Sequence, residues 1–220
     1  MGKNVGDMLK LAEIVSEFVD LVEFRFDYLS TLNDLCLDPF VQYPCIVTVR
    51  GVDDGGMYNG DLNLKLKVYR DAIEVGLPYI DVELGLDEYI VDLVNFRDDI
   101  GSRTKIIVSY HNFDLTPEYC VMEDVVEKEL ACGDLAKIAT MVNDKKDVLD
   151  ILRLVSQFDG KLIGIGMGSK GKITRILNLY FGSPMTFVSV CGMSSAPGQL
   201  DLNEFFSLVR HLQSIGLDIY

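Results

Sequence analysis

The sequence is poor in the side chains that bind transition metals. It has only two histidines, His111 and His211, and its cysteines form no Cys-x-x-Cys pair. A zinc site needs several Cys or His ligands close together, so we expect no protein metal site. We expect reduced and mostly buried thiols rather than disulfides at the five cysteines, which are Cys36, Cys45, Cys120, Cys132 and Cys191.

Long apolar runs and positive charge are also scarce. No stretch approaches the ~20 apolar residues of a membrane helix, and the amino terminus MGKNVGDMLK lacks a secretory layout. We therefore expect a cytoplasmic protein without membrane contact.

Lys and Arg number 20 against 34 Asp and Glu, a net charge of −14. Nucleic-acid binding needs clustered positive charge, so we expect no nucleic-acid partner. A locally basic pocket for a small anion remains compatible with this net charge.

Nothing in the sequence marks a domain boundary. The chain has 220 residues, 49% of them hydrophobic, and shows no linker, low-complexity tract or charge block. This length and composition suffice for one sizeable core. We predict a single catalytic domain over residues 1–220.

Short β-branched segments alternate with longer amphipathic ones. The helical segments, such as 61–76 and 143–158, carry apolar residues at spacings of three and four. This alternation predicts repeated βα units and a parallel sheet. The expected strands are residues 20–26, 44–50, 79–84, 104–110, 134–141, 161–167 and 185–190.

The strands favour a closed barrel over an open sheet. No glycine-rich turn follows the first strand, although one (164–171) follows the sixth. Alternation puts Glu23 and Arg25 on one strand face, and Asp81 and Glu83 on another. A polar interior with apolar outer faces suits an α/β protein of the (β/α)8 barrel type. Only seven strands are visible and the chain begins with a helical segment, so we expect the first strand to be missing or very short.

Lys137 and His111 are the candidates for covalent and proton-transfer chemistry. Lys137 lies in an otherwise apolar strand, where desolvation favours the neutral amine that attacks carbonyls. A structural lysine held charged by Glu23 or Glu83 is an equally open interpretation. His111 ends a strand and could transfer protons near neutrality, or could be structural.

Arginines at strand ends suggest a carboxylate site. Arg25 and Arg50 occupy such positions and could clamp a carboxylate through paired hydrogen bonds. Arg175 lies in a helical segment, where composition alone favours the surface. Residues 194–201 contain Pro and Gly and are predicted to form a connecting loop, which we expect to close over a substrate.

Several strings together resemble the type I 3-dehydroquinate dehydratases over nearly the whole chain. The family's E-x-R-x-D is similar to "EFRFD" (23–27), and T-x-R-x-x-x-E-G-G is similar to "TVRGVDDGG" (48–56), with Asp54 in place of Glu. SYHDF resembles "SYHNF" (109–113), with Asn112 in place of Asp.

The later strings continue the resemblance in the same order. D-x-x-K-I-A matches residues 134–139, M-G-x-x-G-x-x-S-R is similar to 167–175, and S-A-P-G-Q stands at 195–199. The resemblance implies an imine-forming Lys137, a proton-transferring His111 and an orienting Asp54. The implied substrate-binding residues are Glu23, Arg25, Arg50, Met167, Arg175, Phe187, Ser195 and Gln199.

The resemblance implies a lyase of the shikimate pathway of aromatic amino acid biosynthesis. Such an enzyme removes water from 3-dehydroquinate through a lysine Schiff base and gives 3-dehydroshikimate, with no metal or organic cofactor. We also expect a homodimer. Two alternatives remain: another imine-forming barrel, such as a class I aldolase, and a non-enzymatic barrel that binds a small acid.

Overall fold

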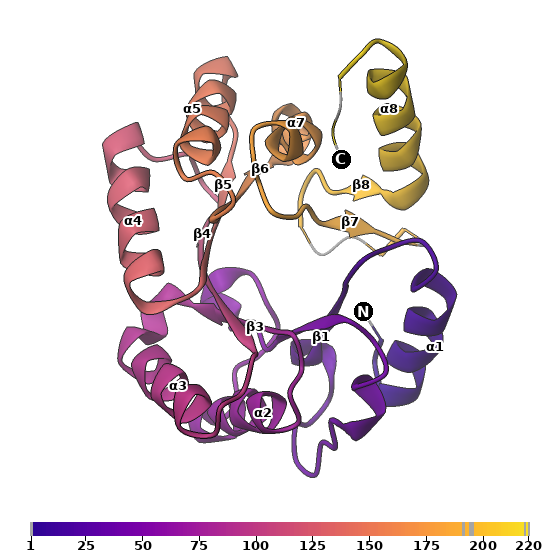
Figure 1. Cartoon of the computed structure of the whole chain (residues 1–220), viewed down its shortest axis with the longest axis vertical. Helices are drawn as coiled ribbons and strands as arrows, with labels where there is room; N and C mark the ends of the chain where they lie inside the picture. Colours follow the sequence, from indigo (N-terminus) through magenta and orange to yellow (C-terminus); the bar gives the residue numbers. More distant parts are fainter. Residues whose placement is uncertain (1, 191, 194–195, 218, 220) are drawn as a thin grey trace. The chain divides into compact units, whose positions relative to one another are not determined.

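A computed structural model describes residues 2–190, 192–193, 196–217 and 219. The chain forms two compact units. Unit 1 comprises Met1–Val108 and Cys132–Asp134, and unit 2 comprises Ser109–Ala131 and Leu135–Tyr220. The single domain over residues 1–220 stays a prediction. Helices and strands alternate along the chain in both units (Figure 1).

Unit 1 begins with a helix. Asn4 caps α1 (Val5–Val15) by accepting a hydrogen bond from the Asp7 amide, and no strand precedes this helix among the described residues 2–4. The missing first strand therefore agrees with the prediction. Three parallel strands follow, β1 (Val22–Arg25), β2 (Cys45–Thr48) and β3 (Tyr79–Glu83). The helices of this unit after β2 are α2 (Leu62–Glu74) and α3 (Asp87–Asp99).

The strands of unit 1 bury one face in an apolar core. Phe24, Val47, Ile80 and Val82 lie in this cluster with the inner face of α2. Their sequence neighbours Arg25, Thr48 and Asp81, on β1, β2 and β3 respectively, are buried polar residues. Because side chains alternate along a strand, the polar residues occupy the opposite face, which confirms the predicted division.

Unit 2 continues the sheet. Strand β4 (Lys105–Asn112) runs from unit 1 into unit 2, and β1 to β6 are paired in chain order. Strands β5 (Leu135–Met141) and β6 (Leu162–Met167) are parallel. The helices are α4 (Tyr119–Cys132), α5 (Lys145–Gln157), α6 (Gly168–Gly171), α7 (Thr174–Tyr180) and α8 (Leu202–Ser214).

The last strands form a separate small sheet. Strand β7 (Val188–Ser189) pairs in parallel with β8 (Leu200–Asp201). All seven predicted strand segments contain a strand, so those predictions are confirmed. The prediction of a loop over 194–201 is wrong at its end, because Leu200 and Asp201 pair with β7 and Asp201 then caps α8.

The cysteines differ from the prediction of mostly buried thiols. Of the four that the structure describes, only Cys45 is buried, whereas Cys36 and Cys120 are exposed and Cys132 is half-buried. Cys45 starts β2 inside the core, and burial raises the pKa of its thiol to about 12. Cys36 instead lies in an irregular segment, where its Sγ donates to Asp38 at 3.4 Å.

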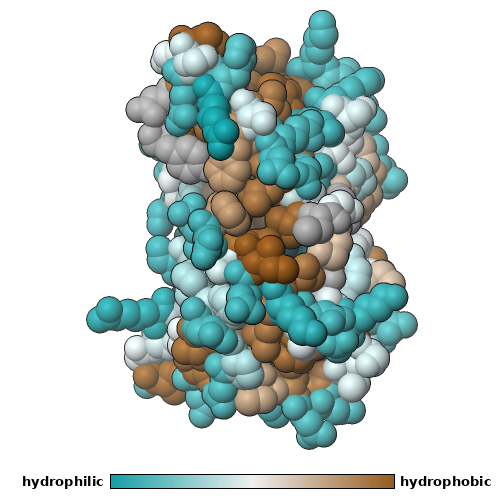
Figure 2. All heavy atoms as spheres, turned by 90° about the vertical axis from the view of Figure 1, so that its right-hand side faces the viewer, coloured by the Kyte–Doolittle hydropathy of each residue, from teal (hydrophilic) through white to brown (hydrophobic). Residues whose placement is uncertain are grey.

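The surface is mainly hydrophilic on the face drawn in Figure 2, with apolar groups exposed between the polar side chains. None of the described helices has both the length and the apolar character required to cross a bilayer.

Candidate active site

Lys137 lies at the third position of β5, on the strand face opposite the apolar cluster that contains Ala136 and Ile138. Its side chain is buried, with 5% of the residue exposed. The ammonium Nζ lies 4.2 Å from the centroid of the Phe187 ring. A cation over an aromatic face is attracted by the ring quadrupole, so this lysine is held at a defined place inside unit 2.

Arg175 lies next to the same phenylalanine. Its Nη1 donates to the carbonyl oxygen of Phe187 at 3.4 Å, and its own carbonyl oxygen accepts from Thr186 Oγ1 at 2.7 Å. Within the described residues, Nε and Nη2 have no hydrogen-bond partner although both are buried. Burial lowers the pKa of this guanidinium to about 10. The group therefore remains a cation at neutral pH, with two donors available to an anion.

The composition-based prediction that Arg175 is a surface residue is wrong, because α7 packs directly onto β6. Thr174 Oγ1 accepts from the Gly166 amide at 2.8 Å, and Asn178 Nδ2 donates to the Gly164 carbonyl. A Cβ on Gly166 would lie 2.9 Å from Thr174 Oγ1 of α7, so glycine permits this close approach. Arg175, next to Thr174, is thereby only 1% exposed.

The end of β6 meets the segment that carries Gln199. Met167 is buried, and the next amide, that of Gly168, donates to the Pro197 carbonyl at 3.1 Å. Gly198 has a φ of +75°, and a Cβ there would lie 2.2 Å from the Gly168 carbonyl oxygen. Only glycine allows this contact, which places the half-buried Gln199 beside the β6–α6 turn. Ser195 lies outside the described residues.

His111 lies near the end of β4, with its ring stacked on Phe113 at a centroid distance of 6.2 Å. Asn112 closes the turn that follows: its Oδ1 accepts from the amides of Asp114 and Leu115 at 3.1 and 3.0 Å. Its Nδ2 donates to the Tyr110 hydroxyl at 3.2 Å. The amide thus makes the turn without placing a carboxylate next to the histidine.

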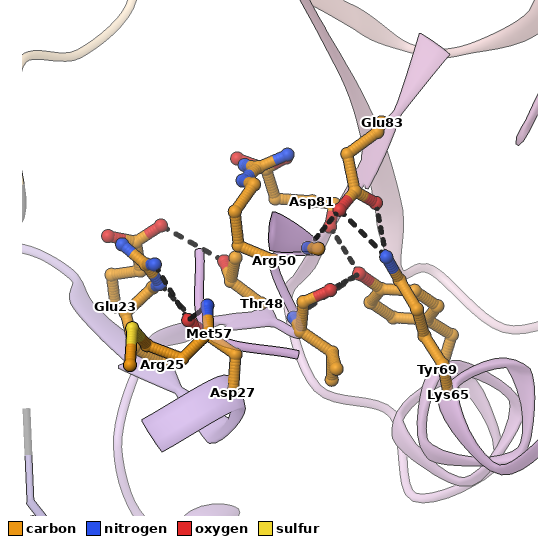
Figure 3. A network of polar contacts seen from close by, with 12 residues as sticks. Glu23, Arg25, Asp27, Thr48, Arg50, Met57, Lys65, Tyr69, Asp81 and Glu83 are labelled. Carbon is orange, nitrogen blue, oxygen red and sulfur yellow. Dashed lines mark hydrogen bonds and ion pairs between the residues drawn. The ribbon is translucent and has the colours of Figure 1, made fainter. Parts of the chain in front are cut away.

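Three candidate residues of unit 1, Glu23, Arg25 and Arg50, belong to a dense polar network (Figure 3). Arg25 forms two 2.8 Å hydrogen bonds with Asp27, and Arg50 donates to Asp81 at 2.7 Å. Glu23 accepts from Thr48 Oγ1 at 3.0 Å. Asp54 is half-buried at the end of the short turn Val52–Asp54, which follows Arg50 and whose other two residues are exposed.

The network raises the pKa values of its arginines. Burial lowers the pKa of Arg25, but the hydrogen bond to Asp27 and the charge of Glu23 outweigh it and raise the pKa. For Arg50, burial again lowers the pKa and the charges of Asp81 and Glu83 raise it above its ordinary value. Both guanidiniums are therefore permanent cations in a fixed orientation.

Sequence reasoning missed Lys65, which is the ammonium partner of Glu83. Its Nζ lies 2.7 Å from each carboxylate oxygen. A signal was present, because this lysine falls on the buried stripe of α2 at helical spacing from the apolar residues Val68, Tyr69, Ala72 and Ile73. Among the residues that the structure describes, no group of His, Cys, Asp and Glu could hold a metal ion.

Together, unit 2 offers an amine buried against an aromatic ring, an arginine with available donors and a histidine at a strand end. Such a set of groups suits covalent amine catalysis on a small carboxylate. An α/β enzyme with a buried lysine among its candidate site groups is the class of protein that this fold and these groups indicate.

Comparison with known proteins defines the family. A model described as type I 3-dehydroquinase matches residues 1–215. The chain is 48% identical over 207 residues to a 3-dehydroquinate dehydratase of Methanocaldococcus jannaschii, covering 94% of each chain. It is 48% identical over 210 residues to that of Methanococcus vannielii, covering 96% of each.

Solved structures that resemble this chain belong to the same family. The 3-dehydroquinate dehydratase from Geobacillus kaustophilus has a TM-score of 0.85 at 25% identity, covering 98% of this chain and 89% of that one. A type I enzyme from Clostridium difficile, described with covalently modified comenic acid, has a TM-score of 0.83 at 28% identity, covering 97% and 89%. The chain belongs to the type I 3-dehydroquinase family. The predicted hydro-lyase class, shikimate-pathway role and α/β barrel class are thereby confirmed.

Proposed function

We propose that the protein removes water from 3-dehydroquinate through an imine formed on Lys137. The observation that carries this proposal is the buried Lys137 ammonium 4.2 Å from the Phe187 ring, whose carbonyl oxygen accepts from Arg175. One residue thus links the candidate nucleophile to the candidate carboxylate binder. The covalently modified comenic acid in the name of the Clostridium difficile structure is consistent with covalent chemistry.

Each step follows from the chemistry of these groups. The Lys137 ammonium first loses a proton to water, and the neutral amine then adds to the ring ketone. Water leaves, giving a protonated imine that acts as an electron sink. His111 then takes a proton from the carbon next to the imine. The electron pair forms the new carbon–carbon double bond, and the hydroxyl departs with the proton returned by His111. Water hydrolyses the imine, so the net change is the loss of one water and no cofactor is needed.

We assign substrate positioning to the other residues of unit 2. Arg175 binds the carboxylate through Nε and Nη2, the two donors that have no hydrogen-bond partner in the described structure. Met167 and Phe187 provide apolar walls. Gln199, held near the β6–α6 turn, and Ser195 bind ring hydroxyls, and these positioned contacts lower the entropic barrier.

For unit 1, the assignment rests on the family motifs. Glu23, Arg25 and Arg50 bind polar groups of the substrate, and Asp54 orients the His111 imidazole. Asp54 is one methylene shorter than the usual glutamate, so we expect a longer or water-mediated hydrogen bond from the imidazole.

Borohydride reduction with 3-dehydroquinate tests the proposed nucleophile. Peptide mapping of the wild type should find the reduced adduct on Lys137, and Lys137→Ala should give neither adduct nor turnover. Lys105→Ala, which removes an exposed lysine of β4, is the matched control and should behave as the wild type. An adduct on another lysine, or none at all, contradicts the assignment.

The role of His111 is tested separately. His111→Ala should still form the imine, because that step needs only the lysine amine, but turnover should fall by about 10²–10⁴-fold. Intact-mass spectra should show a covalent species that accumulates without borohydride. The exposed His211 of α8 provides the control variant His211→Ala. Wild-type turnover of His111→Ala would rule out its role as the base.

We further propose a cytoplasmic homodimer. Ile173, the residue before α7, lies at helical spacing from Leu177 and Tyr180 of that helix. Ile173 and Tyr180 are exposed, whereas Ile176 and Leu179 pack into the cluster with α8. An apolar stripe of this kind favours burial against a second copy. Light scattering should give a dimer for the wild type and a monomer for Tyr180→Glu. Leu149→Glu, at an exposed apolar site on α5, should remain dimeric. A monomeric wild type contradicts the proposal.

A further inference from the structure

The loop between Arg50 and Tyr58, here called the Arg50–Tyr58 loop, carries both Arg50 and Asp54. It folds back on itself: the Tyr58 amide donates to the Arg50 carbonyl at 3.0 Å, and the Gly56 amide donates to the Gly51 carbonyl at 2.9 Å. A Cβ on Gly56 would lie 2.1 Å from the Arg50 carbonyl oxygen, so the two limbs of the loop are in contact. A displacement of one limb therefore displaces the other.

Two carboxylates from neighbouring segments hold this loop at its two limbs. Glu83 Oε1, at the end of β3, accepts from the Gly51 amide at 2.7 Å. Asp27 Oδ2, after β1, accepts from the Met57 amide at 3.1 Å. Figure 3 shows the Asp27 contact beside Met57 and the Glu83 carboxylate above Lys65. The position of the loop thus depends on where these two carboxylates lie.

Each carboxylate has its own cation. Asp27 is paired with Arg25, which belongs to a motif of the family. Glu83 is paired with Lys65 of α2, and the two side chains are only 4% and 6% exposed. Lys65 belongs to none of the strings that carry the resemblance. A buried carboxylate that loses its cation is strongly destabilised. The Lys65 ammonium therefore stabilises the charged Glu83 carboxylate at the position where it accepts from Gly51.

The charge of Glu83 also acts on Arg50. Burial lowers the pKa of Arg50, and the charges of Asp81 and Glu83 outweigh that effect and raise it. Arg50 donates to Asp81 at 2.7 Å, whereas both oxygens of Glu83 accept from Lys65. Without Lys65, two carboxylates would compete for one guanidinium, and Arg50 would be drawn from its place on Asp81.

We propose that Lys65 is a positioning residue for the dehydration reaction: by neutralising Glu83 it fixes the Gly51 amide and leaves Arg50 to Asp81, and so sets the places of Arg50 and Asp54. The link to the reaction rests on the proposed function. The link to the loop rests on the contacts alone, and the two are tested by different measurements.

The variants isolate the charge of Lys65. Lys65→Met keeps most of the side-chain length and removes the ammonium. Lys65→Met with Glu83→Gln removes both charges, and the glutamine carbonyl can still accept from Gly51. Lys67→Met is the matched control, because Lys67 is on the same helix but exposed and paired with Asp71. Circular dichroism checks that each variant is folded.

Residue-resolved hydrogen exchange tests the loop without any substrate. We expect the Gly51 amide to exchange faster in Lys65→Met, and to return towards the wild-type rate in the double variant. The Lys67→Met control should match the wild type. Unchanged Gly51 exchange in a folded Lys65→Met overturns the positioning role, whether or not the proposed function holds.

Kinetics tests the link to the reaction. We expect kcat/KM for 3-dehydroquinate to fall about tenfold or more in Lys65→Met, since small displacements of positioned groups are costly. The double variant should recover most of this loss, which separates charge from packing. A double variant as slow as the single one overturns the proposal. If Lys65→Met does not fold, a folded and active double variant supports the charge role, and an inactive one contradicts it.

The pH profile gives a signature that a packing role would not produce. In Lys65→Met, the buried Glu83 carboxylate has lost its ammonium partner and faces Arg50, Asp81 and the Tyr69 hydroxyl. As the pH falls, protonation removes the unpaired charge, and kcat/KM relative to the wild type should rise. This ratio should stay flat in the double variant. A flat ratio in Lys65→Met contradicts the mechanism. A wild type without turnover would refute the proposed function, while the exchange data still decide the loop.

Discussion

Buried arginines in the two units have different partners, and their pKa values shift in opposite directions. In unit 1, Arg50 donates to the buried carboxylate of Asp81, and nearby negative charge raises its pKa. In unit 2, Arg175 is equally buried, but its Nη1 donates to a backbone carbonyl, Nε and Nη2 have no partner among the described residues, and burial lowers its pKa to about 10. The guanidinium of Arg50 is thus paired with a carboxylate in unit 1. That of Arg175 in unit 2 keeps two donor nitrogens without a partner among the described residues.

This difference separates two uses of charge. A guanidinium paired with a carboxylate fixes the geometry of the protein, because removing one partner leaves an uncompensated charge. A guanidinium without a carboxylate reduces stability until an anion arrives, and it then binds that anion with little rearrangement. We interpret the ion pairs of unit 1 as contacts that hold Arg25 and Arg50 in place for the substrate, and Arg175 as a site whose donors are kept for the substrate carboxylate.

The largest effect should be on the stability of unit 1. Arg50→Met leaves Asp81 buried without its arginine, so we expect the free energy of unfolding to fall by about 3–5 kcal/mol. Adding Asp81→Asn should recover much of this loss. Urea denaturation of both variants measures it, and a loss below about 1 kcal/mol would show that the pair is not structural.

Arg175 should show the reverse pattern, with a large effect on activity. Loss of its hydrogen bonds to a carboxylate should lower kcat/KM in Arg175→Met by about 10²–10³-fold, mainly through KM. Its free energy of unfolding should stay unchanged or rise by up to about 2 kcal/mol, because a costly buried cation is removed. Arg175→Lys keeps the charge but not the planar fork, and should be intermediate in activity. A destabilised Arg175→Met would remove the contrast with Arg50.

Ligand binding should depend on Arg175 even without chemistry. In a Lys137→Ala background, 3-dehydroquinate at about 100 times its Kd should stabilise the fold by about 2.7 kcal/mol. Adding Arg175→Met should abolish this stabilisation at the same concentration. Thermal melts measure both, and the simple carboxylate acetate serves as the control ligand. Equal stabilisation in both proteins would place the carboxylate elsewhere.

The smallest effect is a pH dependence of stability. The folded-state pKa of Arg175, about 10, lies below its ordinary value in the unfolded chain. Between these values the unfolded chain binds more protons, so the contribution of Arg175 to stability rises with pH. The free energy of unfolding of the wild type should therefore be lower than that of Arg175→Met by its full amount below about pH 10. This difference should become smaller towards about pH 11. Urea denaturation across this range measures the difference, and a constant gap contradicts the lowered pKa.

The sequence alone determined the order of the strands and the location of the principal chemical groups. Each of the seven strand segments contains a strand, because β-branched runs and period-two alternation are local properties of the chain. Lys137 and His111 were identifiable from strand context and from their family strings. The apolar faces of β1 and β3 followed from the same alternation.

Only the tertiary structure decided which charged side chains are buried and what they contact. Arg175 looked like a surface residue by composition, but α7 packs onto the glycines of β6 and buries it. Lys65 and Lys67 stand two positions apart in one helix, and packing on β3 buries the first and leaves the second exposed. Residues 200–201 became a strand only because β7 lies beside them. Burial and pairing depend on partners distant in the chain, whose positions local sequence does not specify.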